Sequence, residues 1–134
     1  MKNLALSITA VTFCITSLGS YVYALETTGK PVTVAAAAIG TGGDYERKMA
    51  EAIECIHASG ELGVDILCLP EEFSGGASEP VPGPTTGALA ELARKYGMYI
   101  ICPLRERHED KEYNTAVLLD RNGAIAGLYR KIFV

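Results

Sequence analysis

The stretch that most constrains the fold runs from Val64 to Phe73 and reads VDILCLPEEF. Its first part, Val64 to Leu69, is a nearly continuous apolar run, which is typical of a strand buried on both faces of a parallel sheet. Pro70 ends such a strand because its nitrogen has no hydrogen to donate. Glu71 and Glu72 follow at the carboxyl end of the strand, where open α/β sheets form their ligand crevices. We therefore expect a carboxylate whose pKa is raised by apolar walls, as suits a general base.

Two strand-helix-strand units are predicted around this stretch, and such crossovers are right-handed and parallel by default. Apolar spacing and turn residues predict a strand at 32–39, a helix from Asp44 to Gly60, the strand at 64–69, a helix from Thr85 or Thr86 to Gly97, and a strand at 98–104. A charged bend at 105–112 then leads to a hairpin with strands at 114–120 and 124–129. Its Arg121-Asn122-Gly123 turn favours a left-handed glycine.

The first 24 residues have the layout of a secretory signal peptide. Lys2 precedes a moderately apolar stretch at 4–18, and a cleavage point after Ala24 has a small residue at −1 and a tolerable one, Val22, at −3. The stretch is too short and too rich in Ser and Thr to span a bilayer well. We expect export to the periplasm or the medium, followed by a lead-in segment at 25–31 and one domain at 32–134.

Charge and cysteine content narrow the classes of partner. The formal net charge is −4, and without a basic patch or a Trp the chain has no feature of a nucleic-acid binder. Cys55, Cys68 and Cys102 lie within helix or strand patterns, so we interpret them as buried small apolar residues. His57 and His108 are isolated in the sequence, which predicts surface histidines and no metal site. A small molecule is the expected partner.

A glycine pattern supports a competing interpretation. Gly40-Thr41-Gly42-Gly43 follows a predicted strand and opens a helix, and Glu71 ends the next strand, as in dinucleotide-binding folds. Tyr45 occupies the place of the third glycine, where it would obstruct close packing of helix and strand. A nucleotide-binding α/β module built on Gly40 to Gly43 stays open as an alternative.

Several segments taken together resemble the nitrilase, or carbon-nitrogen hydrolase, superfamily over 31–134: LPEEF, ARKYG before YIICPL, and YNTAVLLDRNGAIAGLYRK. The resemblance implies an α/β fold, namely the N-terminal part of a nitrilase-like α-β-β-α sandwich. It also implies a hydrolase of a small amide, carbamoyl compound or nitrile that uses a Glu-Lys-Cys triad without a metal or organic cofactor. The full-length protein is expected to be a homo-oligomer.

By the same resemblance, Glu71 matches the general base and Lys131 matches the lysine that stabilises the tetrahedral intermediate, whereas Glu72 matches no catalytic position. Family members place the nucleophilic Cys after the lysine, and this sequence ends three residues after Lys131. We expect Cys68 and Cys102 to be inert core residues, and the chain to be a fragment, inactive and poorly soluble alone. An inactive remnant, or pseudoenzyme, is the alternative.

Overall fold

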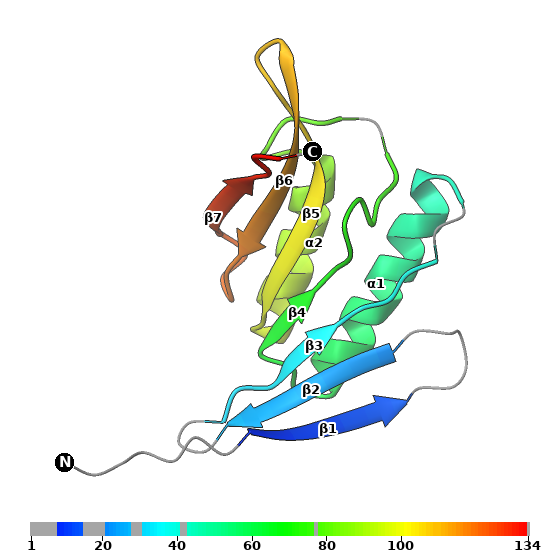
Figure 1. Cartoon of the computed structure of the whole chain (residues 1–134), viewed down its shortest axis with the longest axis vertical. Coiled ribbons are helices and arrows are strands. Elements are labelled where there is room, and N and C mark those ends of the chain that lie inside the picture. The colour runs from blue at the N-terminus through cyan, green and yellow to red at the C-terminus, as the bar shows by residue number, and fades with distance from the viewer. Residues whose placement is uncertain (1–7, 15–20, 28–30, 41–42, 77, 134) are drawn as a thin grey trace, which may run out of the picture.

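The computed structural model describes residues 8–14, 21–27, 31–40, 43–76 and 78–133 of the 134-residue chain. A five-stranded mixed sheet has the order β3-β4-β5-β6-β7, and a separate antiparallel pair is formed by β1 and β2 (Figure 1). The predicted α/β class is confirmed. The strands are β1 (Ile8–Cys14), β2 (Tyr21–Thr27), β3 (Val34–Ala36), β4 (Ile66–Cys68), β5 (Tyr99–His108), β6 (Lys111–Leu119) and β7 (Ile125–Arg130), and the helices are α1 (Tyr45–Glu61) and α2 (Pro84–Tyr96).

The first two strands fall in the region predicted as leader and lead-in. β1 and β2 pair antiparallel along their whole length, and β2 lies beside β3 (Figure 1). Residues 1–7 and 15–20 of the predicted leader, and 28–30 of the lead-in, lie outside the described residues. Backbone pairing does not test cleavage, so a signal peptide ending at Ala24 stays a prediction. No helix in the described ranges is long and apolar enough to cross a membrane.

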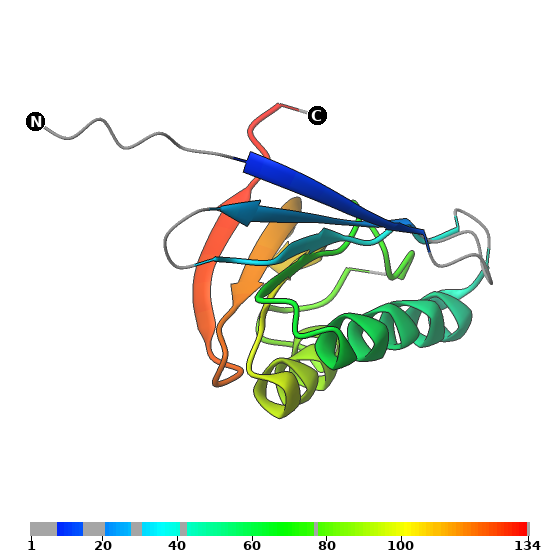
Figure 2. The same ribbon diagram turned by 90° about the horizontal axis from the view of Figure 1, so that it is seen from below.

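The core lies between the sheet and its two helices. β3, β4 and β5 are parallel, and α1 and α2 form the crossovers between them, as predicted. Both helices cover the same face of the sheet (Figure 2). Leu67 of β4, Ile100 of β5, Ile56 of α1 and Leu89 of α2 are fully buried. The opposite face of the sheet is therefore free of helices in the described part of the chain.

The residues predicted to end the helices and the hairpin act largely as expected. Asp44 caps α1 by accepting a backbone hydrogen bond of 3.0 Å, and Gly97 ends α2 in the left-handed region with φ 60°. Gly123 is also left-handed in its turn, with φ 76°. At the start of α2 the cap differs from the prediction. Gly83 precedes the helix, and Thr86 accepts its backbone N–H at 2.8 Å from within the first turn.

The predicted charged bend at 105–112 is wrong. β5 continues to His108 and β6 begins at Lys111, so the two strands form one long hairpin. The charges fit this hairpin because Arg105, Glu106 and Glu112 each have a side-chain partner. The Glu106 carboxylate is buried against Arg130, so a charged residue occupies an inward-facing strand position.

The two histidines have different surroundings. His57 is half-buried on α1, and its Nδ1 lies 2.5 Å from the hydroxyl of Tyr96 on α2. The prediction of a lone surface histidine is therefore wrong for His57, because the helix-helix contact supplies a partner that the sequence does not place near it. His108 is exposed at the end of β5, as predicted.

Candidate active site

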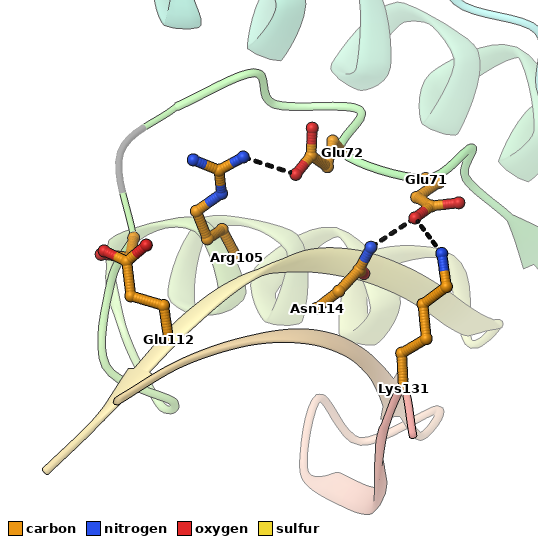
Figure 3. Close-up of polar contacts among 7 residues, drawn as sticks. Glu71, Glu72, Arg105, Glu112, Asn114 and Lys131 are labelled. Atoms are coloured by element: carbon orange, nitrogen blue, oxygen red, sulfur yellow. Dashed lines mark hydrogen bonds and ion pairs between the residues drawn. The ribbon is translucent and has the colours of Figure 1, made fainter. Parts of the chain in front are cut away.

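Three polar side chains from distant parts of the sequence meet at one edge of the sheet. The parallel strands β4 and β5 end at this edge, β6 starts back from it, and β7 returns to it. Glu71 follows β4, Asn114 lies near the start of β6, and Lys131 follows β7, so the strand directions alone bring them together (Figure 3).

A tight turn after β4 presents Glu71 to the site. Leu69 and Phe73 are 4% and 2% exposed, so the turn is fixed to the core at both ends. The backbone N–H of Phe73 also donates to the carbonyl oxygen of Pro70 at 3.2 Å. Between these two apolar anchors the side chain of Glu71 points outwards and is 59% exposed.

The carboxylate of Glu71 accepts two hydrogen bonds on one oxygen. Lys131 Nζ donates to Glu71 Oε1 at 2.9 Å, and Asn114 Nδ2 donates to the same oxygen (Figure 3). The backbone N–H of Lys131 donates to the Asn114 carbonyl oxygen at 2.8 Å, which continues the pairing of β6 and β7 by one residue. The structure therefore unites the two residues expected to be catalytic, Glu71 and Lys131. It adds Asn114, which belongs to the YNTA segment.

The electrostatics of Glu71 differ from the expectation. The hydrogen bond from Lys131, and then that from Asn114, lowers the pKa of the Glu71 carboxyl below its ordinary value of 4.5. The predicted rise in pKa is wrong here, because the carboxylate is largely exposed and faces an ammonium group instead of apolar walls. Glu71 is consequently ionised at neutral pH and can accept a proton.

A small cavity lies against this group. Its volume is about 190 Å³. The lining combines the three polar side chains with apolar ones from the helix-free part of the sheet: Glu71, Pro103, Asn114, Ala116, Tyr129 and Lys131. A carboxylate and an ammonium beside a small apolar surface can bind a compact polar molecule and move a proton on it.

The carboxylate of the next residue, Glu72, is bound by Arg105 and lies away from the cavity. Glu72 has a left-handed backbone with φ 49°, and its Oε1 accepts a hydrogen bond of 2.8 Å from Arg105 Nη2 (Figure 3). Glu72 does not line the cavity. The turn thus separates two adjacent carboxylates, one towards Lys131 and one towards Arg105.

The described cysteines do not reach the cavity. Cys102 is fully buried, and burial raises the pKa of its thiol to about 12. Burial also raises the pKa of the half-buried Cys68. A raised thiol pKa disfavours the reactive thiolate at both positions, which agrees with the interpretation of these residues as non-catalytic, although Cys68 is less buried than expected. Cys55 is half-buried on α1, less buried than expected.

Two other predicted features remain untested. Thr41 and Gly42 lie outside the described residues, so the nucleotide-binding alternative at Gly40 to Gly43 stays a prediction. Across the described ranges, no group of three His, Cys, Asp or Glu side chains could hold a metal ion.

Sequence reasoning missed an ion pair beside the site, formed by Glu106 and Arg130. Glu106 is 2% exposed, and Arg130 donates to both of its oxygens at 2.8 and 2.7 Å. The available signal was the strand period of two. Cys102, Leu104 and Glu106 alternate along β5 and share its inward face.

This ion pair predicts a loss of stability in acid. The hydrogen bond from Arg130, and then that from Thr115, lowers the pKa of Glu106 from 4.5 to about 2. Because the folded-state pKa is the lower one, the stabilisation is complete above pH 4.5 and is lost as the pH falls to about 2. Removing one partner of a fully buried pair costs about 3 to 5 kcal/mol. Because the Arg130 side chain is 37% exposed and water can solvate its charge, Glu106→Gln should lower the free energy of unfolding at pH 7 by less than this amount. Urea unfolding at pH 7 and pH 3 measures both effects.

The exposed pair of Glu91 and Arg94 provides the control. Its side chains are 73% and 54% exposed, and such pairs contribute about 0 to 1 kcal/mol. Glu91→Gln should therefore leave the pH dependence of unfolding unchanged. Equal pH dependence in the Glu106→Gln variant and the unmodified protein would contradict the prediction.

Comparison with known sequences identifies relatives of this chain. The family model described as carbon-nitrogen hydrolase matches residues 33–133. A β-ureidopropionase from Arabidopsis thaliana is 41% identical in an alignment of 91 positions that covers 57% of this chain and 22% of that protein. A formamidase from Bacillus cereus strain Q1 is 29% identical in an alignment of 103 positions that covers 66% of this chain and 31% of the formamidase. The chain thus spans less than a third of the length of these curated relatives.

Solved structures share the fold. A carbon-nitrogen hydrolase from Helicobacter pylori G27 superposes with a TM-score of 0.67 at 18% identity, covering 76% of this chain and 40% of that one. The NitFhit protein of C. elegans gives a TM-score of 0.67 at 21% identity, covering 75% of this chain and 28% of that one. The arrangement of the five-stranded sheet and its two helices is therefore that of part of the nitrilase fold, as expected.

Proposed function

The chain belongs to the carbon-nitrogen hydrolase family, and from this premise we propose that it supplies part of the active site of a hydrolase acting on a non-peptide carbon-nitrogen bond. The substrate is a small amide, a carbamoyl compound or a nitrile. One observation carries the proposal: the Glu71 carboxylate and the Lys131 ammonium lie 2.9 Å apart at a small cavity. The chain spans less than a third of the length of these relatives. We therefore propose the activity for the whole protein as it occurs in the cell, which we call the natural protein.

The two residues have complementary roles in the proposed reaction. Glu71 removes the proton of a thiol, and the thiolate attacks the carbon of an amide. Negative charge then develops on the former carbonyl oxygen, and the Lys131 ammonium stabilises it. The intermediate collapses to a thioester as the amine departs with a proton from Glu71. A water molecule, deprotonated by Glu71, hydrolyses the thioester and restores the thiol.

The thiol is proposed to come from outside residues 31–133, in a segment that follows Lys131 in the natural protein. Cys68 and Cys102 have raised thiol pKa values and do not line the cavity. Cys68→Ala and Cys102→Ala should each leave kcat/KM close to that of the unmodified protein in an ammonia-release assay. Loss of activity in a folded Cys68→Ala or Cys102→Ala protein would place the nucleophile inside the sheet and contradict the prediction.

Turnover of a substrate panel tests the proposed function. The panel contains 3-ureidopropionate, formamide and a short aliphatic nitrile, because the relatives named above are a β-ureidopropionase and a formamidase. We expect ammonia release from at least one of these compounds by the natural protein. Failure with every carbon-nitrogen compound tested would favour an inactive remnant of the family.

Export and self-association of the natural protein are further proposals. Sequencing of the mature N-terminus should start at Leu25, the residue after the proposed cleavage point. An intact Met1 in the mature protein would contradict export through a cleaved signal peptide.

Self-association is tested by light scattering of the purified protein, which should give a mass at least twice its chain mass.

A further inference from the structure

The ion pair between the buried Glu106 and the partly exposed Arg130 lies directly beside the lysine of the site. Arg130 donates through Nε to Glu106 Oε2 at 2.8 Å and through Nη2 to Oε1 at 2.7 Å. Thr115 Oγ1 also donates to Oε2 at 2.6 Å. The guanidinium carbon of Arg130 lies 4.4 Å from the ring centroid of Tyr113. Contacts on two sides therefore fix the arginine in place, and its planar fork matches the carboxylate.

Because Arg130 and Lys131 are adjacent in the strand, a fixed Arg130 also limits the position of Lys131. Successive side chains of a strand point to opposite faces of the sheet. Arg130 is paired with Thr115 across β6 and β7 and points to the helix-covered face, where Glu106 is buried. Lys131 is the next residue, and its ammonium lies on the other face against Glu71. A fixed Arg130 thus determines the direction in which Lys131 leaves the strand.

Backbone pairing with β6 holds this end of β7, including the bond from the Lys131 N–H to the Asn114 carbonyl oxygen, but few described side-chain contacts add to it. This strand is an edge strand of the five-stranded sheet, and Leu128 and Tyr129 are 51% and 61% exposed. The residues after the lysine, Ile132 and Phe133, are 74% and 86% exposed. Apolar burial therefore contributes little to fixing the strand end, and the pair with Glu106 is its main side-chain anchor among the described residues.

We propose that Glu106 is a positioning residue, which holds the Lys131 ammonium on the Glu71 carboxylate by anchoring Arg130. The geometric part of this proposal stands on the contacts alone. Its consequence for catalysis rests on the proposed hydrolase function, so the test needs one measurement that does not depend on turnover.

That measurement is the pKa of Glu71 in the natural protein, followed by ¹³C NMR of labelled glutamate and assigned with a Glu71→Gln sample. In the Glu106→Gln variant we expect the pKa of Glu71 to rise towards its ordinary value of 4.5, because Lys131 is no longer held against it. Loss of the Glu106 charge without any movement would instead lower the pKa of Glu71, since one negative charge is removed and Arg130 is left unpaired. The sign of the shift therefore decides between positioning and direct electrostatics.

A double variant covers the case in which Glu106→Gln does not fold. Glu106→Met combined with Arg130→Met removes both charges, and apolar replacement of a buried pair is often tolerated. We again expect the pKa of Glu71 to rise. Asp65→Asn is the matched control, because it breaks the ion pair with Arg121 away from the site and should leave the pKa unchanged. An unchanged or lowered pKa in the folded double variant would overturn the proposal.

Kinetics provide the second arm. If the hydrolase function holds, the Glu106→Gln variant should lose up to roughly 10²-fold in kcat with little change in KM, because a small displacement of a catalytic group affects the chemical step. A rise in the pKa of Glu71 in a protein that hydrolyses none of the panel would support positioning while removing the proposed function. An unchanged kcat together with an unchanged pKa would remove the positioning role alone.

Discussion

Replacing Glu71 by Gln is expected to lower kcat/KM of the proposed carbon-nitrogen hydrolase by about 10² to 10⁴-fold. Glutamine keeps the size of the side chain and can still contact Asn114, but it cannot accept the proton of a thiol. Because the hydrogen bond from Lys131 lowers the pKa of Glu71, the unmodified protein has the base fully ionised at neutral pH. Steady-state ammonia release at pH 7 measures the loss.

Glu72 provides a closely matched control for this substitution. It is the adjacent residue, it is also an exposed carboxylate, and it is bound to Arg105 instead of Lys131. Glu72→Gln should therefore retain most of the activity. Equal losses in the two variants would show that the turn as a whole matters and that Glu71 has no separate role as the base.

The second large effect is expected for Lys131→Met. Methionine retains a similar apolar stem but has no ammonium group, so the oxyanion of the intermediate loses its cation. Loss of one preorganised donor of this kind costs roughly 3 to 4 kcal/mol, or about 10² to 10³-fold in kcat. Because the charge appears only as the reaction proceeds, kcat should fall much more than KM changes. Rapid mixing with saturating substrate measures the chemical step directly.

Lys111→Met controls for the loss of a positive charge. Lys111 is exposed at the start of β6, where it pairs with His108, and it does not line the cavity. The variant should retain kcat. If Lys131→Met changed KM alone, Lys131 would contribute to substrate binding, and its proposed role in the intermediate would be wrong.

The sequence was sufficient to predict the elements that place the site. The run from Val64 to Leu69 indicates a buried strand because it is short, apolar and ended by Pro70, and the structure has β4 within it. The turn residues Gly97 and Gly123 have the left-handed conformations that their positions favour. These features are local, since each depends on the residues next to it in the chain. Local rules therefore determine which segments reach the edge of the sheet where Glu71 lies.

The rest depends on partners that are distant in sequence. In the sequence, the charged segment 105–112 resembles a loop. In the structure, it forms strands because Arg130, 24 residues beyond Glu106, binds the buried Glu106 carboxylate. The prediction for the pKa of Glu71 failed for the same reason. The sequence led us to expect apolar walls around a carboxylate at a strand end. The structure instead places Lys131, 60 residues away, on its oxygen. Sequence motifs identified both residues. They did not indicate whether the ammonium of Lys131 or apolar neighbours would determine the pKa of the Glu71 carboxyl.

The central claim is that Glu71 and Lys131 act as one unit in hydrolysis of a carbon-nitrogen bond. A double-mutant cycle tests it most directly, with kcat/KM measured by ammonia release for the unmodified protein, Glu71→Gln, Lys131→Met and the two substitutions combined. Residues that serve the same step are strongly non-additive, so we predict that the double variant is about as active as the weaker single variant. A double variant as active as the unmodified protein, or losses that simply multiply, would contradict the claim.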